Sequence, residues 1–383
     1  MPAADAMIRH ACRIAAMTAA MVSWVSPANA GDAEDPARVR RAIAYLDARQ
    51  ETWSQFAGAR RGEGADGTTC VSCHTGISYA LSRPELGRFA GTPGLAAPER
   101  RMIAAVGLRV GHWADLDSPR FGLMYDSDDR KKAESRGTEA VLNALILAND
   151  DAARGRATPG EATEEAFRRL WETQATGGDD AGSWDWLNFG LEPWEADGSR
   201  AFGAALAAIA VGSAPGPPGR ALDERASRGV RSLGDYLRRR FPEESLHNRL
   251  WIFEASKSFE GLLTADRKRE VVDQVLAARG VDGGWALAAL GDFRRVDDTP
   301  QARDSDGYAT GLVVHVLLRA GSPSGGPEVA RGLGWLRAHQ RADGSWPGRS
   351  ANKERDPSSF AGRLMTDAAT AFAARSLAEA GSR

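Results

Sequence analysis

A helix pattern that recurs at the two ends of the chain constrains the fold more than any other feature. Residues 39–50 (VRRAIAYLDARQ) and 329–340 (VARGLGWLRAHQ) carry apolar side chains at the same positions, and each is followed shortly by a Trp, Trp53 or Trp346. Apolar residues at i, i+3 and i+4 are typical of an amphipathic helix with one buried face. Internal repetition indicates one structural unit used more than once. The chain therefore reads as an array of helical repeats.

Six amphipathic segments of this kind occur, and each is followed by a loop and a second segment that is apolar on more of its circumference. The second kind predicts burial on all sides. We expect outer helices at residues 39–50, 99–112, 163–174, 226–240, 267–279 and 329–340. We expect inner helices at residues 77–82, 138–148, 200–211, 248–262, 308–319 and 367–380. Asp306 and Thr366 stand where N-caps begin two of the inner helices. The predicted fold class is all-α, a single (α/α)6 toroid of alternating outer and inner helices.

The N-terminal 30 residues read as a secretory signal peptide. Arg9 and Arg13 precede a soft apolar run over residues 14–25, and residues 28–30 (ANA) form a cleavage site. The apolar run is shorter than the ~20 residues that span a bilayer, so we expect no membrane span after cleavage. We therefore predict a cleaved segment at 1–30, one toroid domain at 31–383, and an exported, periplasmic protein.

Residues 70–74 (CVSCH) form a C-x-x-C-H motif. Two thiols three residues apart can each form a thioether to a haem vinyl group, and the adjacent imidazole can then bind the iron. A redox C-x-x-C pair and half of a zinc site are the alternatives. The predicted mature chain has no second close pair of Cys or His for zinc, and a redox pair is expected near a βαβ pattern, which is absent. We predict one covalent haem c per chain, with Cys70 and Cys73 as anchors and His74 as the proximal ligand.

The repeat pattern places this motif in the first outer-to-inner loop, so we expect the haem over the end of the toroid where the inner helices begin. Met124 and His112 are the first candidates for the second axial ligand. Both precede inner helices or adjoin loops expected at that end, and we rank them ahead of His247, His315, His339 and Met365. An iron with an open coordination position is the remaining alternative.

Residues 340–346 (QRADGSW) resemble the Gln-to-Trp motif of squalene-hopene cyclases and their relatives. Degenerate copies lie at residues 174–184 and 282–285, and residues 306–311 (DGYATG) resemble the inner-helix starts of that superfamily. The resemblance covers most of residues 36–380. It implies an (α/α)6 toroid like those of terpenoid cyclases and protein prenyltransferase β-subunits, in which the Gln and Trp of the motif pack and cap helix ends.

The cyclases of this family protonate an isoprenoid with a D-x-D-D carboxylate cluster, and this chain has three imperfect versions. Residues 304–307 contribute Asp304 and Asp306, residues 295–299 contribute Asp297 and Asp298, and residues 126–129 read as a charged turn well before its helix. Prenyltransferases bind zinc through Asp, Cys and His, and no cysteine outside the haem motif serves that role after cleavage. Both activities are therefore disfavoured, and these four aspartates are weak catalytic candidates.

With 383 residues, 43% apolar and 26% charged residues and a formal charge of −2, the chain is an ordinary globular protein without the basic character of a nucleic-acid binder. The preferred prediction is an exported monohaem c-type cytochrome that transfers electrons to an unidentified redox protein, with an apolar or isoprenoid molecule in the toroid centre. The alternatives are a haem-dependent oxidoreductase or a redox or gas sensor with an open iron, and a terpenoid cyclase with an atypical acid motif.

Overall fold

The computed structural model describes residues 33–62, 67–92, 94–116, 118, 121–216 and 223–382. Helices dominate these residues, and the extended structure is a two-stranded antiparallel ribbon of β1 (Arg60–Arg61) and β2 (Thr68–Thr69). The predicted all-α class is confirmed. The signal peptide predicted at residues 1–30 lies outside the described residues.

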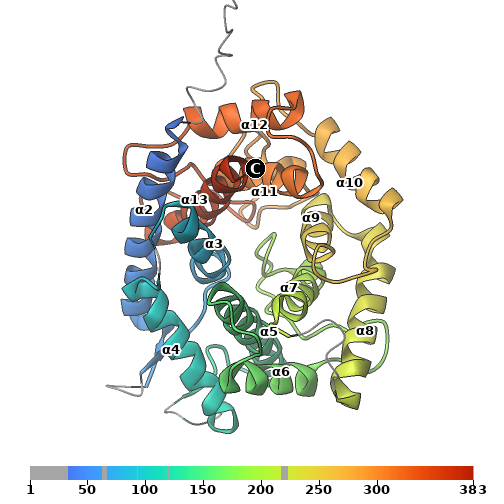
Figure 1. Ribbon diagram of the computed structural model, residues 1–383. Helices are drawn as coiled ribbons and strands as arrows, with labels where there is room; N and C mark the ends of the chain where they lie inside the picture. Colours follow the sequence, from blue (N-terminus) through green and yellow to red (C-terminus); the bar gives the residue numbers. More distant parts are fainter. Residues whose placement is uncertain are drawn as a thin grey trace, which may run out of the picture.

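The helices alternate between an outer and an inner layer around one axis (Figure 1). The outer helices are α2 (Asp35–Gln55), α4 (Ala97–Gly111), α6 (Glu161–Thr173), α8 (Glu224–Arg240), α10 (Ala265–Ala277) and α12 (Pro327–Ala338). The inner helices are α3 (Thr75–Phe89), α5 (Asp129–Ala153), α7 (Arg200–Ser213), α9 (Leu246–Ala255), α11 (Gly307–Arg319) and α13 (Phe360–Gly381). Each inner helix contacts the next, and α13 contacts α3, so the inner layer closes on itself. Short 3-10 turns lie in the connections, at Ala57–Ala59, Trp113–Asp115, Asp197–Ser199, Phe241–Glu243 and Leu287–Ala289.

The two layers differ in burial as the sequence pattern predicts. In α7 every residue from Ala201 to Ala210 is buried, because outer helices cover one side and inner helices the other. In α8 only one stripe, which includes Leu233 and Leu237, is buried, and the opposite face carries arginines. Amphipathic helices outside and uniformly apolar helices inside therefore account for the double layer.

Tryptophans in three of the loops fasten the loop to the end of the preceding outer helix. Their indole N–H groups donate to main-chain carbonyls in the last turn of α6, α10 and α12, where carbonyls lack helical partners. These bonds run from Trp184 to Leu170 at 2.8 Å, from Trp285 to Val275 at 2.7 Å and from Trp346 to Leu336 at 2.7 Å. The structural role expected for these motifs is confirmed.

The motif glutamines link neighbouring outer helices. The Gln174 amide at the end of α6 donates to the Gly229 carbonyl in α8 at 3.0 Å. The Gln340 amide after α12 donates to the Arg38 carbonyl in α2 at 2.9 Å. The second bond joins the last outer helix to the first, so the same side chain that connects consecutive repeats also closes the outer layer.

Helix starts follow the predictions in part. Asp306 is the N-cap of α11, as expected, and its carboxylate accepts from the backbone N–H groups of Tyr308 and Ala309. The N-cap predicted at Thr366 is wrong, because α13 begins earlier and Ser359 caps it. The charged turn at residues 126–129 is also not well before its helix, since Asp128 caps α5 directly.

A buried carboxylate joins the first and last repeats. Asp367 of α13 accepts from Arg49 Nε at 2.8 Å and from the Tyr45 hydroxyl at 3.0 Å, both in α2. Its other oxygen accepts from Thr75 Oγ1, in the first turn of α3, at 2.6 Å. Because Arg49 and Asp367 are both buried, removing one charge leaves the other without compensation.

The substitution Asp367→Ala is expected to lower the free energy of unfolding by about 3–5 kcal/mol, because it strands the Arg49 guanidinium in the closure of the ring. Urea denaturation followed by circular dichroism measures the change. As a control, Asp266→Ala removes an exposed carboxylate paired within one turn of α10, and we expect a loss of less than about 1 kcal/mol. Equal losses in the two variants would contradict the role given to Asp367.

Candidate functional site

Residues 70–74 lie between α2 and α3, at the end of the ring where the inner helices begin. The Cys70 N–H donates to the Ala59 carbonyl at 2.8 Å, and the Trp53 indole donates to the Cys70 carbonyl at 2.7 Å. Ser72 Oγ accepts from the Thr75 N–H at 2.7 Å and so satisfies one free donor of the first turn of α3. The main chain of the C-x-x-C-H motif is therefore fixed on both sides.

Burial sets the charge state of the motif. It lowers the pKa of His74 to about 4, helped by the nearby Arg355, so the imidazole is neutral at pH 7. The His74 ring meets Trp194 edge-on with centroids 4.8 Å apart, and no hydrogen bond to its nitrogens is found among the described residues. Burial also raises the pKa of the Cys70 thiol to about 12 and that of Cys73 well above its usual value. Both thiols are unpaired and protonated.

The candidates for a second axial ligand separate in the structure. Met124 lines the same small cavity as Cys70, beside Tyr125, whereas His112 stacks on Phe121 with centroids 4.0 Å apart and contacts Asp115. The lower-ranked candidates have partners of their own, since His247 contacts Tyr308 and Asn248, His315 contacts Glu254, His339 stacks on Trp335, and Met365 is buried in α13. Of these side chains, Met124 is the one that shares the cavity with the motif.

The donor set suits a covalent haem, because it offers two free thiols and a neutral, unbonded imidazole in one turn. The space beside Cys70 is smaller than a haem requires. The cavity there has a volume of about 30 Å³, enough for one or two water molecules. A porphyrin would displace its walls, which include Met124, Tyr125 and Leu187.

Aromatic side chains fill the axis of the ring at this end. The Tyr308 hydroxyl lies 2.8 Å from His247 Nε2 and accepts from the Trp251 indole at 3.2 Å. Trp194 packs edge-on against Tyr308, and Phe372 packs against Trp251. Side chains thus occupy the place predicted to hold an apolar or isoprenoid molecule.

The four aspartates named as weak catalytic candidates, from two separate motifs, lie in different environments. Asp306 is buried, which raises its pKa to about 6 although backbone donors lower it, and its second oxygen accepts from the Leu287 N–H at 2.7 Å. Asp304 is exposed and pairs with Arg349. Asp297 and Asp298 are exposed, and Asp297 accepts from Thr299 and from the Glu354 N–H. Asp306 has a helix-capping role, and the others lie on the surface.

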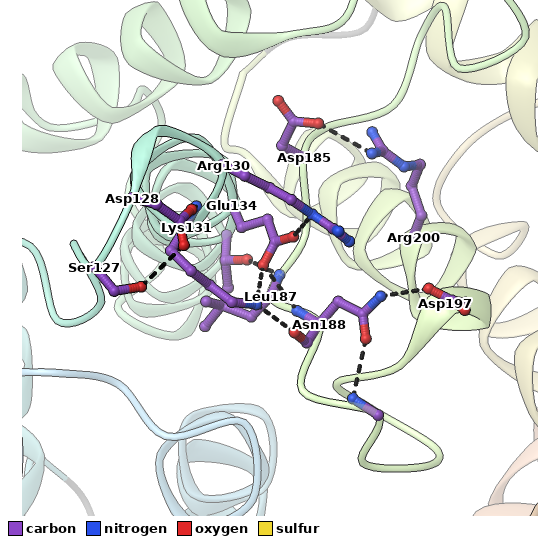
Figure 2. A network of polar contacts seen from close by, with 12 residues as sticks. Ser127, Asp128, Arg130, Lys131, Glu134, Asp185, Leu187, Asn188, Asp197 and Arg200 are labelled. Carbon is purple, nitrogen blue, oxygen red and sulfur yellow. Dashed lines mark hydrogen bonds and ion pairs between the residues drawn. The ribbon is translucent and has the colours of Figure 1, made fainter.

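A polar hollow of about 330 Å³ lies between the N-terminal ends of α5 and α7, and we call it the α5–α7 hollow. Its lining combines carboxylates, guanidinium groups, an amide and one indole. It is lined by Arg130, Ala133, Glu134, Asp185, Trp186, Asn188, Ala196, Asp197 and Arg200. The helices supply Arg130, Ala133, Glu134 and Arg200, and the connection from α6 to α7 supplies the rest. Figure 2 shows the polar residues of this lining. None of these residues was a candidate from the sequence.

Close packing holds this connection against the inner helices. A side chain at Gly137 of α5 would meet the Asp185 carbonyl at 2.2 Å, and one at Gly203 of α7 would meet the Trp186 ring at 2.2 Å. The Leu187 N–H donates to Thr138 Oγ1 of α5 at 2.9 Å. Glycine at two helix positions thus allows the approach that places Asp185 and Trp186 in the hollow.

The charges in the hollow are of two kinds. Glu134 is buried and fully engaged, since it accepts from Arg130 Nε at 2.8 Å, Lys131 Nζ at 2.5 Å and the Asn188 N–H at 3.2 Å. Burial alone would raise its pKa, but these donors lower it, so Glu134 is a fixed anion. Asp185 accepts from Arg200 at 3.0 Å through Oδ1.

Asp197 accepts from the Asn188 amide through Oδ1. Neither Asp185 Oδ2 nor Asp197 Oδ2 has a hydrogen-bond partner among the described residues. The hollow therefore presents two exposed carboxylates, each with one oxygen free, on a scaffold fixed by Glu134 (Figure 2).

Comparisons with known proteins bear on the fold. No family model and no curated protein matches the chain. Solved structures of glycosidase variants do match, one with 13% identity and a TM-score of 0.51 and another with 14% identity and a TM-score of 0.51, each over 90% of this chain and 98% of the other. A third, in complex with glucose, has 13% identity and a TM-score of 0.50 over 91% of this chain and 98% of the other. At these identities the matches establish a shared helical fold.

These matches overturn the predicted function, because the neighbours are glycosidases and not cytochromes. The prediction of a c-type cytochrome that transfers electrons was wrong, and so were its haem-enzyme, sensor and cyclase alternatives. Two physical observations count against the cyclase alternative: aromatic side chains fill the axis, and the candidate aspartates cap a helix or lie on the surface. In the part of the chain that the structure describes, no three His, Cys, Asp or Glu side chains form a metal site, and no helix is long and apolar enough to cross a membrane.

The thiols of Cys70 and Cys73 are expected to resist alkylation in the folded protein. With a pKa of about 12, about one Cys70 thiol in ten thousand is ionised at pH 8, and only the thiolate reacts. Peptide mapping by mass spectrometry after iodoacetamide treatment measures the modified fraction, with urea-unfolded protein as the positive control. Rapid modification of both cysteines at pH 8 in the folded protein would show that burial does not suppress their ionisation.

Proposed function

We propose that the protein binds a carbohydrate in the α5–α7 hollow and hydrolyses a glycosidic bond there. The observation that carries this proposal is the pair of exposed carboxylates, Asp185 and Asp197, each with a free oxygen, in a hollow that Asn188 also lines. Carboxylates and amides satisfy the hydroxyl groups of a sugar. A volume of about 330 Å³ is at the small end of ligand pockets and suits one sugar ring.

Glycoside hydrolysis commonly uses two carboxyl groups that flank the scissile bond. One donates a proton to the departing oxygen, and the other activates water or attacks the sugar directly. Asp185 and Asp197 are the candidates for this pair, and Arg200 holds Asp185 in position. Glu134 is not a candidate, because three donors already engage its oxygens; it orders Lys131 and Asn188 beneath the site.

The matched solved structures support a carbohydrate as the substrate, since all three are described as glycosidases and one contains glucose. Membership in the superfamily of squalene-hopene cyclases is a separate proposal, supported by the Gln-to-Trp motifs and their bonding. Export to the periplasm also stays a proposal, and it rests on the signal-like sequence at residues 1–30.

Asparagine substitutions at Asp185 and Asp197 test the hydrolytic proposal. Each should reduce hydrolysis of a responsive aryl glycoside by about a hundredfold or more, because an amide neither donates an acidic proton nor activates water. Release of nitrophenol from a panel of nitrophenyl glycosides measures activity, and affinity electrophoresis in polysaccharide gels measures binding. Asp266→Asn, on the exposed face of α10, is the matched control and should keep full activity. Absence of both hydrolysis and binding in the parent protein would rule the proposal out.

We further propose that haem c attaches covalently through Cys70 and Cys73, with His74 as an iron ligand and Met124 the nearer candidate for a second ligand. The proposal concerns the cofactor alone. Two protonated thiols three residues apart and a neutral, unbonded imidazole support it, and it requires the Met124–Tyr125 wall to open. When bound, haem supplies an iron centre that its axial ligands tune.

Coexpression with a cytochrome c maturation system should yield one covalent haem per chain, because maturation acts on the C-x-x-C-H motif. The pyridine haemochrome spectrum of protein purified under denaturing conditions measures it. Replacing Cys70 and Cys73 together with Ala should abolish the spectrum, whereas Cys12→Ala, outside the motif, should preserve it. No covalent haem in the parent protein, from cells that mature a control cytochrome, would reject the cofactor.

A further inference from the structure

A second cavity, of about 690 Å³, opens at the opposite end of the ring from the α5–α7 hollow. Its lining comes from the C-terminal ends of α3, α5, α11 and α13. These four inner helices are neighbours in the ring (Figure 1). Its charged lining comprises Glu85, Arg88, Arg319, Arg375 and Glu379. The proposed hydrolytic site uses none of these residues, so this cavity needs a separate explanation.

One arginine of the cavity is anchored by a buried network. Arg375 donates from Nε to Glu85 at 2.8 Å and from Nη2 to Glu254 at 3.4 Å. Glu254 also contacts His315 Nε2 at 3.1 Å, and His315 is completely buried in the middle of α11. Arg375 is thus positioned by charges behind it, which is how a preformed binding site holds a guanidinium.

The other two arginines make no such hydrogen bonds, although the charge of Arg319 helps to lower the pKa of the Glu254 carboxyl. No hydrogen bond or ion pair to the side chain of Arg88 or Arg319 is found among the described residues, although Nε of Arg319 is buried. The negative ends of helix dipoles attract cations, and this accounts for an arginine in the last turn of α3 and of α11. The helix dipole does not explain the buried Nε–H group of Arg319. A buried donor without an acceptor costs free energy unless a ligand accepts its hydrogen bond.

Apolar side chains lie beside these charges. Leu81, Pro84 and Phe89 of α3 and Ala152 and Ala153 of α5 form part of the wall. A ligand that satisfies both parts of the lining carries an anionic group for the guanidiniums and an apolar body for this wall. Guanidinium groups bind carboxylates and phosphates with paired, charge-assisted hydrogen bonds.

We infer that this cavity binds a small organic anion, a carboxylate or phosphate on a partly apolar body, with Arg88 and Arg319 as the ligands of its charged group. Arg375 is held by Glu85 and Glu254 beside them, and the apolar wall of α3 and α5 covers the body of the molecule. The site lies at the opposite end of the inner helices from Asp185 and Asp197, and it is independent of the proposed hydrolysis.

Isothermal titration of the full chain with three related compounds tests the inference. Benzoate and phenyl phosphate carry the two anionic groups on one apolar ring, and benzamide matches benzoate in shape without the charge. We expect saturable binding of at least one anion and binding of benzamide at least about tenfold weaker. The tighter of the two anions identifies the head group.

Variants locate the binding. Arg319→Gln and Arg88→Gln should each weaken anion binding about tenfold, and Arg88 is exposed, so its replacement leaves the fold intact. Arg331→Gln, an exposed arginine on α12 outside the cavity, should have no effect. Equal binding of benzamide, no binding of either anion, or full retention of binding in the Arg88 and Arg319 variants would overturn the inference. An equal loss in Asp197→Asn would also overturn it, because the anion would then lie in the α5–α7 hollow.

Discussion

Closure of the inner ring depends on one buried carboxylate. Asp367 receives hydrogen bonds from α2 and from the start of α3, so it fixes the last inner helix to the first repeat. A buried charge is costly unless protein donors replace the water that it loses. An arginine and two hydroxyl groups supply three hydrogen bonds to Asp367. The hydrogen bond from Thr75 has a second effect, because this residue follows His74 directly. Closure therefore also positions the C-x-x-C-H motif.

The closed ring leaves little room at its centre, and this determines where ligands can bind. Trp194, His247 and Tyr308 meet on the axis at the end where the inner helices begin. The exposed carboxylates of Asp185 and Asp197 lie away from this centre, in the hollow between α5 and α7. At the other end, the inner helices line a cavity of about 690 Å³ with three arginines.

Local sequence patterns predicted the helices well. They did not predict contacts between residues that are distant in the sequence. Both kinds of helix were found because burial on one face or on all faces leaves a periodic trace, and Asp306 was a correct N-cap because capping is local. Thr366 failed because α13 extends beyond the apolar run from which its start was inferred. Nothing in the sequence indicates that Glu134 and Asn188 contact each other in the folded chain. The one available hint was the density of acidic, amide and aromatic residues in the connection from α6 to α7.

The amide bonds of Gln174 and Gln340 have a consequence for how the molecule comes apart. In an open array of repeats the terminal units have one neighbour each, and they fray first. Here the Gln340 amide links α12 to α2 in the same way that the Gln174 amide links α6 to α8. The first and last repeats therefore both have two neighbours. Opening any single repeat then breaks two interfaces at once. The ring has no weak end from which unfolding can begin.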